Sequence, residues 1–195
     1  MDKEKITVIE RPKTISWEEI SSVLKRAHEE NVHKGIVLPY PHLPPEVLKK
    51  KTEGLGGRIF VALYDGHVVA TGAVAIIEKS FWCGKGKYAY CFLDAVLPKF
   101  AGKGLYGEIV KVQEEYARNH TLDRMMFDTD ERNKRMLAIS KRYDYRYVQY
   151  RVRDGHNSVV MVKWLNGCPY SRLKCALMFF CIKWKKIIAS KMREL

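Results

Sequence analysis

The chain has 195 residues, 47% of them hydrophobic and 29% charged, so it is long and apolar enough to bury a core as a single globular domain. A net charge of +13 favours an anionic partner such as nucleic acid, a membrane surface or a phosphorylated cofactor. The chain has five cysteines without a C-x-x-C pair and shows no apolar signal segment, which together predict a cytoplasmic protein with reduced thiols. No apolar run reaches about 18 residues, so we expect no spanning helix.

The apolar periodicity predicts strands interspersed with helices. Ser16 and Glu19 form a capping box before an amphipathic helix, and Asp65-Gly66 is a two-residue hairpin signal. The segment Gly84-Lys85-Gly86-Lys87 is interpreted as a solvated loop between two strands. In chain order, the expected elements are strand 6–9, helix 17–30, a short helix from Pro45 ending before Gly54, strands 58–64, 67–77 and 90–97, helix 105–120, strand 124–129, helix 133–143, strands 145–152 and 158–165 around the turn Asp154-Gly155-His156-Asn157, and a helix within 168–195.

The centre of the chain is a strand followed by a glycine-rich loop and a helix. The strand ends in Val96-Leu97-Pro98, and the loop contains Gly102, Gly104 and Gly107. Such a unit directs unpaired backbone N–H groups at the positive end of a helix dipole, which is a site for phosphate or pyrophosphate. The missing Gly-Lys-Ser/Thr excludes a P-loop. A dinucleotide fingerprint, Gly-x-Gly-x-x-Gly, and a turn without a ligand remain open alternatives.

The same segment resembles the central motif of the GCN5-related N-acetyltransferase (GNAT) superfamily, in which V-x-P precedes Arg/Gln-x-x-Gly-x-Gly/Ala and a helix. Ala101 and Tyr106 depart from that pattern. The resemblance covers roughly residues 5–165 and implies a mixed α/β (α+β) fold, with a mostly antiparallel central sheet of about six to seven strands flanked by helices. It divides the chain into an acyltransferase domain, 1–167, and an additional basic, apolar helical extension, 168–195.

The resemblance also implies an activity and a coenzyme A site. An acyl group, most often acetyl, would pass from acetyl-CoA or another acyl-CoA to a small-molecule or peptide amine held by the first helix and the proline-rich stretch through Pro45. The strand before the loop would pair with pantetheine, and the loop amides would hold the pyrophosphate. The implied coenzyme A residues are Asp94, Ala95, Val96, Gly102, Lys103, Gly104, Leu105, Tyr106, Gly107 and Asn133.

The catalytic groups are less well defined by the pattern. Ser140 stands where the family often has a tyrosine that protonates the departing thiolate, and Tyr143, one turn later, could replace it or simply pack. Glu78 and Asp94 could relay the amine proton through water, or could be ordinary strand carboxylates. The resemblance also implies that a backbone amide near Ala95 or Val96 would stabilise the oxyanion. The histidines have no metal-ligand spacing, so no metal is expected.

The C-terminal segment 168–195 contains seven Lys or Arg residues and one Glu, a net charge of +6. Three interpretations stay open: contact with an anionic membrane through residues 173–193, contact with a second subunit in a homodimer, or packing on the same domain. Nucleic acid is disfavoured because no stacking or groove-reading motif is present. The alternative to an enzyme is a catalytically silent GNAT-like module that binds a membrane or a protein through this helix.

Overall fold

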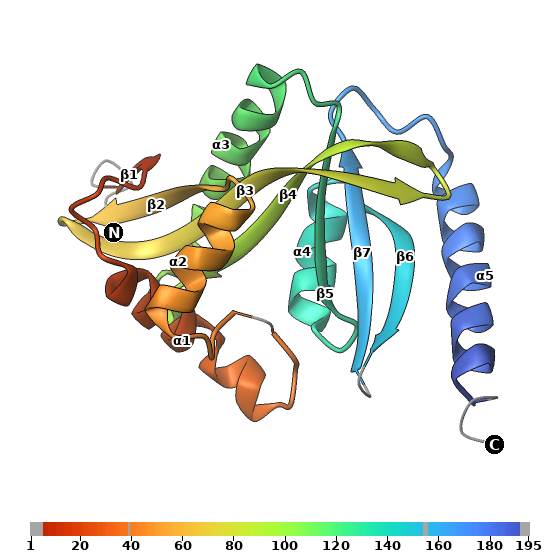
Figure 1. Ribbon diagram of the computed structural model, residues 1–195, viewed down its shortest axis with the longest axis horizontal. Coiled ribbons are helices and arrows are strands. Elements are labelled where there is room, and N and C mark those ends of the chain that lie inside the picture. The colour runs from red at the N-terminus through yellow and green to blue at the C-terminus, as the bar shows by residue number, and fades with distance from the viewer. Residues whose placement is uncertain (1–5, 39, 154–155, 192–195) are drawn as a thin grey trace.

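The computed structural model describes residues 6–38, 40–153 and 156–191, which form one twisted sheet with helices packed against it (Figure 1). The sheet has seven strands in the order β1-β2-β3-β4-β5-β7-β6. Every neighbouring pair is antiparallel except β4 and β5, which confirms the predicted mixed, mostly antiparallel sheet. The strands are β1 (Ile6–Glu10), β2 (Arg58–Tyr64), β3 (His67–Phe81), β4 (Gly84–Val96), β5 (Arg124–Asp130), β6 (Arg146–Arg153) and β7 (His156–Trp164).

Helices α1 and α4 begin at residues whose side chains cap the first turn, and the first of these caps was predicted. The Ser16 hydroxyl accepts a hydrogen bond from the Glu19 amide (3.2 Å), and the Asn133 side chain accepts one from the Met136 amide (3.1 Å). In Figure 1, α1 and α2 cover one face of the β2–β4 part of the sheet and α3 covers the other. The helices are α1 (Trp17–His33), α2 (Pro45–Gly54), the 3₁₀ turn η2 (Pro98–Phe100), α3 (Leu105–Asn119), α4 (Lys134–Arg142) and α5 (Arg172–Lys191).

The core follows from this layering. Residues 68–75 of β3 are buried without interruption, because helices cover both faces of the central strands. One cluster joins α1, α2 and α3 to β2–β4, and a second joins α3, α4 and α5 to β5–β7. At the junction of β4 and β5, the paired residues Ala89 and Met125 belong to the second cluster.

The interpretation of Gly84-Lys85-Gly86-Lys87 as a loop is wrong. These residues are the first four of β4, with Gly84 opposite Phe81 and Lys87 opposite Glu78. The hairpin turns at Trp82 and Cys83 instead. A Cβ at Gly86 would collide with the Arg124 guanidinium. The missing side chain therefore lets Arg124 of the neighbouring strand β5 approach closely, and this glycine does not mark a turn.

Of the two other predicted hairpin turns, the structure confirms the first and describes only part of the second. Asp65 and Gly66 both have positive φ (+48° and +79°), the geometry of a type I′ turn, so that prediction is confirmed. In the last hairpin, His156 and Asn157 belong to β7, and Asp154-Gly155 lies outside the described residues.

The C-terminal helix α5 lies along β6 at one edge of the molecule (Figure 1). Its Phe179, Ile182 and Ile187 join the second core cluster, and the Phe179 ring lies 4.6 Å from that of Tyr147. Within the described part of the chain, no helix is both long enough and apolar enough to span a bilayer.

Candidate active site

The two parallel strands of the sheet separate at their carboxyl ends. The β4–β5 ladder consists of Ala89 opposite Met125 and Tyr90 opposite Met126. Residues 91–96 of β4 run on without pairing to β5, while β5 stays paired to β7 as far as Asp130. An unpaired strand edge presents backbone N–H and C=O groups to any extended ligand. The fold therefore opens a wedge between β4 and β5.

Two hollows meet in this wedge, and both are lined by His28, Asp94, Asn133 and Met136. We call the first the tyrosine hollow; its other walls include Leu38, Tyr40, Tyr90, Phe92, Asp128 and Thr129. We call the second the loop hollow; it adds Ala27, Asn31, Ala95, Val96, Tyr106 and Arg135. A molecule extending from one hollow to the other would pass His28 and the backbone of Asp94.

A β-bulge in β4 shapes the wedge. The register with β3 shifts between Thr71 and Ala73, and Leu93 adopts a positive φ of +56°, which is unusual for a residue with a side chain. Side chains bind two carbonyls of the bulge: the Thr71 hydroxyl donates to Leu93 O (2.7 Å), and His28 Nε2 lies 3.2 Å from Asp94 O. Strained backbone held by its surroundings is a recurrent feature of functional sites.

The glycine loop has the conformation that the sequence predicts. Gly102 and Gly104 have φ of +75° and +86°, a region in which side chains are strained, and Gly104 is the N-cap of α3. Among the described residues, the amides of Gly107 and Glu108 bond to Gly104 O (2.9 and 3.3 Å). The backbone hydrogen bonds of that part of the chain give no acceptor to the amides of Gly102, Gly104, Leu105 and Tyr106. These four N–H groups remain for an anion at the helix N-terminus.

The structure divides the implied coenzyme A residues between two surfaces. Asp94, Ala95, Val96, Tyr106 and Asn133 line the loop hollow. The glycine loop's Lys103, Gly104 and Leu105 line another hollow, beside β1, and Lys103 Nζ lies 5.4 Å from the centre of the Phe100 ring.

Gly107 serves packing in this structure. Its amide is engaged within the helix, and a Cβ at this position would collide with the Tyr143 hydroxyl. The Tyr143 ring also meets Tyr106 edge-on, with ring centres 5.7 Å apart. Tyr143 thus holds the end of α4 against the start of α3, which agrees with the packing alternative for this residue.

The remaining catalytic candidates lie apart from one another. Ser140 is buried, and its hydroxyl donates to Leu137 O (2.8 Å) within its own helix. Glu78 sits opposite Lys87 on the distal half of the β3–β4 hairpin and pairs with Lys85 (3.0 Å). Neither residue lines the tyrosine hollow or the loop hollow.

Asp94 presents its carboxyl group to α3. Gln113 Nε2 donates to Asp94 Oδ1 (2.8 Å) and to Ala73 O (3.0 Å). Burial raises the pKa of the Asp94 carboxyl to about 7, although the hydrogen bond from Gln113 lowers it. The backbone of Asp94 faces the wedge through its carbonyl, while the side chain is a buried group of the core.

His28 is a candidate functional residue that the sequence did not single out, and it lines both hollows. It follows Leu24 by one turn on the buried side of α1, and a polar side chain on an apolar stripe was the available signal. Because a carbonyl only accepts, Nε2 carries the proton toward Asp94 O, and Nδ1 presents a lone pair, 3.4 Å from Asn31 Nδ2. Burial lowers the pKa of His28 from 6.5, so the imidazole is neutral at pH 7.

The tyrosine hollow combines aromatic walls with the carboxylate of Asp128, whereas the Asp94 carboxyl group bonds to Gln113. The Tyr90 hydroxyl donates to Asp128 Oδ1 (2.8 Å), and the Tyr90 ring stacks on Phe92 with centres 5.5 Å apart. The Tyr40 ring centre lies 5.8 Å from that of Phe92. Burial raises the pKa values of Tyr90 and Tyr40, so both stay neutral hydroxyl groups. Aromatic faces beside a carboxylate suit a cationic ligand.

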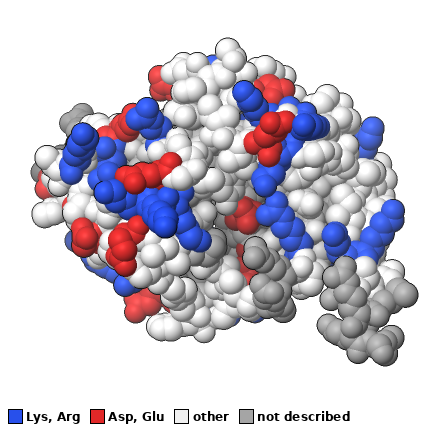
Figure 2. Space-filling model, in the orientation of Figure 1, with Lys and Arg blue, Asp and Glu red and all other residues white. Residues whose placement is uncertain are grey.

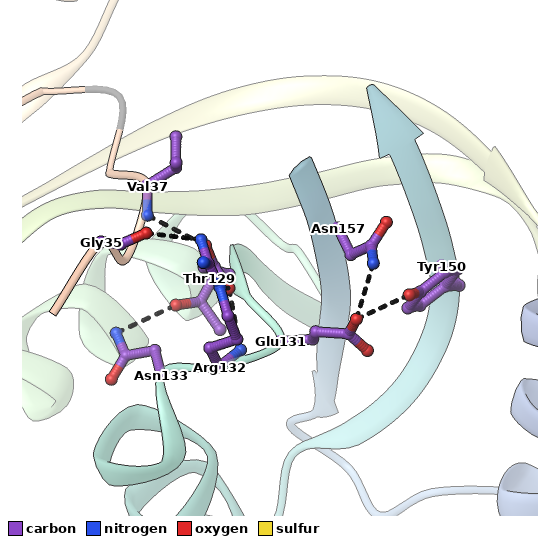
Figure 3. A network of polar contacts seen from close by, with 9 residues as sticks. Gly35, Val37, Thr129, Glu131, Arg132, Asn133, Tyr150 and Asn157 are labelled. Atoms are coloured by element: carbon purple, nitrogen blue, oxygen red, sulfur yellow. Dashed lines mark hydrogen bonds and ion pairs between the residues drawn. The ribbon is translucent and has the colours of Figure 1, made fainter. Parts of the chain in front are cut away.

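A polar network fixes the segment that carries Tyr40. Asp130 accepts hydrogen bonds from the Val37 amide (2.9 Å) and from Arg132, and Arg132 Nη2 donates to Gly35 O (2.6 Å). Burial alone would raise the pKa of Asp130, but the bonds from Arg132 and Val37 lower it to about 2. Figure 3 shows this network at the end of β5, with Glu131 turned the other way toward Tyr150 and Asn157 (both 2.8 Å).

No group of three or more His, Cys, Asp or Glu side chains within residues 6–38, 40–153 and 156–191 is arranged to hold a metal ion.

Comparison with known proteins identifies a family and solved structures of similar fold. The model of the acetyltransferase (GNAT) family matches residues 17–145. Similar solved structures include the ribosomal-protein-S18-alanine N-acetyltransferase from Escherichia coli, with a TM-score of 0.63, 13% identity, and 85% of this chain and 97% of that chain covered. A GNAT acetyltransferase from Elizabethkingia anophelis with acetyl-CoA bound has a TM-score of 0.58 and 14% identity, covering 84% of this chain and 100% of the other. Arabidopsis thaliana NAA60, in complex with a bisubstrate analogue, has a TM-score of 0.59 and 15% identity over 81% of this chain and 99% of its own. Curated proteins provide no match in sequence.

Proposed function

The chain belongs to the acetyltransferase (GNAT) family, and we propose that it transfers an acyl group, most often acetyl, from acetyl-CoA to a small-molecule or peptide amine. The observation that carries this proposal is the wedge between β4 and β5, whose loop hollow reaches Tyr106 in the first turn of α3, where the amides of Leu105 and Tyr106 have no backbone acceptor within the described chain. When bound, the coenzyme supplies a thioester whose carbonyl carbon the amine attacks, forming a C–N bond as the C–S bond breaks. The neighbour from Elizabethkingia anophelis, which binds acetyl-CoA, supports this choice of donor.

The chain's own groups divide the binding work. The amides of Gly102, Gly104 and Leu105 hold the pyrophosphate at the start of α3, with Lys103 adding positive charge. The free edge of β4 at Asp94–Val96 pairs with the pantetheine arm as an additional strand would. A backbone amide near Ala95 stabilises the negative charge that develops on the carbonyl oxygen.

His28 accepts the proton that the amine must lose. A lysine-like ammonium has a pKa of about 10, so the attacking nitrogen needs a nearby base. The acceptor is Nδ1 of a neutral His28 at the junction of the two hollows, which takes this proton directly or through a water molecule once its long hydrogen bond from Asn31 Nδ2 (3.4 Å) is released. Because Ser140 bonds to Leu137 O, the thiolate leaves without a proton from that position, and a thiol pKa of about 8.5 makes this tolerable.

Acetyl-CoA binding tests the loop directly. Gly104→Asp forces a side chain into a left-handed conformation and brings a negative charge to the helix N-terminus, so we expect Kd measured by calorimetry to rise by about tenfold. Gly66→Asp is the matched control, because Gly66 also has positive φ (+79°) and open space, at the remote β2–β3 turn. Equal Kd values for the two variants, or no binding to the natural chain at millimolar ligand, would refute the loop assignment.

A substitution at Asp128 tests whether the tyrosine hollow binds the amine acceptor. Asp128→Asn keeps an acceptor for the Tyr90 hydroxyl but removes the charge, so we expect KM for cationic amines to rise by about tenfold and KM for neutral arylamines to stay unchanged. Asp123→Asn, an exposed carboxylate at the other end of β5, is the control. The measurement is coenzyme A thiol release across a panel of amines. A similar rise for both amine classes would mean that Asp128 does not select charge.

A catalytically silent binding module is the second candidate, and the engagement of Ser140 within its own helix favours it. Sustained thiol release with any amine excludes that alternative.

A further inference from the structure

Helix α5 exposes a continuous line of large apolar side chains, which we call the outer stripe. The spacing of three or four residues places its members along one side of the helix over a length of about 22 Å. In the described chain the other large exposed hydrophobics are Val37 and Leu55, at 40% and 38%. The outer stripe consists of Leu173, Leu177, Phe180, Trp184 and Ile188, with exposed fractions of 69%, 57%, 58%, 50% and 52%.

The opposite side of α5 packs against the domain of its own chain. Phe179 packs against Tyr147 and Tyr150, and Cys175 is buried. Lys183 Nζ binds Glu131 Oε2 (2.7 Å) and lies 4.9 Å from the centre of the Tyr150 ring. The helix is therefore held in place, and the outer stripe faces away from the domain that holds it.

The charge around the outer stripe has one sign. Helix α5 contains no Asp or Glu, and Lys174 and Lys185 lie about 80–100° around the helix from Trp184. In Figure 2 the part of the surface over α5 shows blue and white atoms without red. A long lysine side chain at this angle can place its ammonium group beside an apolar contact surface.

We propose that the outer stripe of α5 docks on an anionic lipid membrane, with Phe180 and Trp184 at the acyl boundary and Lys174 and Lys185 among the headgroups. Such a surface offers apolar contact and negative charge together, which are the two features that the helix displays. A second copy of the chain is a less suitable partner for the outer stripe than an anionic membrane. A symmetric contact between two α5 helices would bring lysines toward lysines, and neither helix contributes a carboxylate.

Vesicle flotation of the full chain tests this proposal. We expect flotation with vesicles of phosphatidylcholine mixed with phosphatidylglycerol, little with phosphatidylcholine alone, and weaker binding as salt increases. Trp184 emission should shift to the blue on binding, and the Trp184→Phe variant should lose that shift. Replacing Lys174 and Lys185 by glutamine should weaken binding to the anionic vesicles by roughly fivefold per charge.

The stripe itself is tested by the double variant Phe180→Gln, Trp184→Gln, which we expect to lower partitioning by at least about tenfold. Leu55→Gln, an exposed apolar residue on the other side of the fold, is the matched control and should float as the natural chain does. Equal flotation of stripe variant and control would overturn the proposal, as would equal binding to neutral vesicles or a lipid-independent dimer that the stripe variant abolishes. Acetyl-CoA binding is measured on the same samples, so loss of docking is distinguishable from failure of the acyltransferase assignment.

Discussion

Replacing His28 by glutamine is expected to lower kcat/KM for amine acetylation by about a hundredfold, within the range typical of a lost general base. Glutamine retains an N–H donor for Asp94 O, so the bulge in β4 keeps its contact with α1. It lacks a basic nitrogen, so the proton of the attacking amine has no acceptor at the junction of the hollows. Acetyl-CoA affinity should change little, because the loop amides and the β4 edge are untouched.

The pH profile separates a proton acceptor from a structural histidine. With the pKa of His28 lowered by burial, the natural chain should keep its kcat/KM down to pH values below the ordinary 6.5 and lose it as the imidazole becomes protonated. The His28→Gln variant should lack that acid limb. His33→Gln, at the exposed end of the same helix, is the control and should retain both rate and profile. An acid limb that persists in His28→Gln would assign the proton transfer to another group.

Much of the fold was predictable from the sequence because local signals and chain order agree. The Ser16 cap, the Asp65-Gly66 turn and the glycine loop before α3 each depend on nearby residues, and all three appear in the structure. The loop interpretation at Gly84-Lys85-Gly86-Lys87 failed for a non-local reason. The β3–β4 hairpin extends beyond its apolar part, and the glycines accommodate Arg124 from a neighbouring strand.

The candidate site was less predictable because it depends on contacts between distant segments. The hydrogen bond from Thr71 to Leu93 O, the contact of His28 with Asp94 O and the approach of Tyr143 to Gly107 each join residues far apart in the sequence. No spacing rule connects these residues. The strand and loop of the proposed coenzyme site could be anticipated from one continuous segment, whereas the proposed proton acceptor and the tyrosine hollow are assembled by the tertiary fold.

Substituting Asp94 by asparagine is expected to stabilise the protein above pH 7. Its folded pKa of about 7 exceeds the unfolded value of about 3.9, so the folded state binds more protons between these values. The contribution of the Asp94 carboxyl group to the free energy of unfolding is fully present below about pH 4. It is lost as pH rises through the folded pKa of about 7. At about pH 8 the natural chain carries a buried charge, at a cost of up to about 4 kcal/mol. Asparagine removes this cost, keeps an acceptor for Gln113 Nε2, and adds a donor near Gln113 Oε1, which has no partner among the described residues.

Thermal unfolding from about pH 5 to about pH 8 measures this effect. The natural chain should lose stability across the range, while Asp94→Asn should stay nearly level and exceed it at the alkaline end. Asp130→Asn should have the opposite effect and lower the stability at neutral pH. Hydrogen bonds from Arg132 and Val37 hold the folded pKa of Asp130 at about 2, below its unfolded value, so the contribution of this carboxylate to stability is present at neutral pH and disappears only in acid. An Asp94→Asn variant less stable than the natural chain at alkaline pH would show that the ionised carboxylate is itself stabilised, and that charge near the β4 bulge is a structural requirement of the wedge.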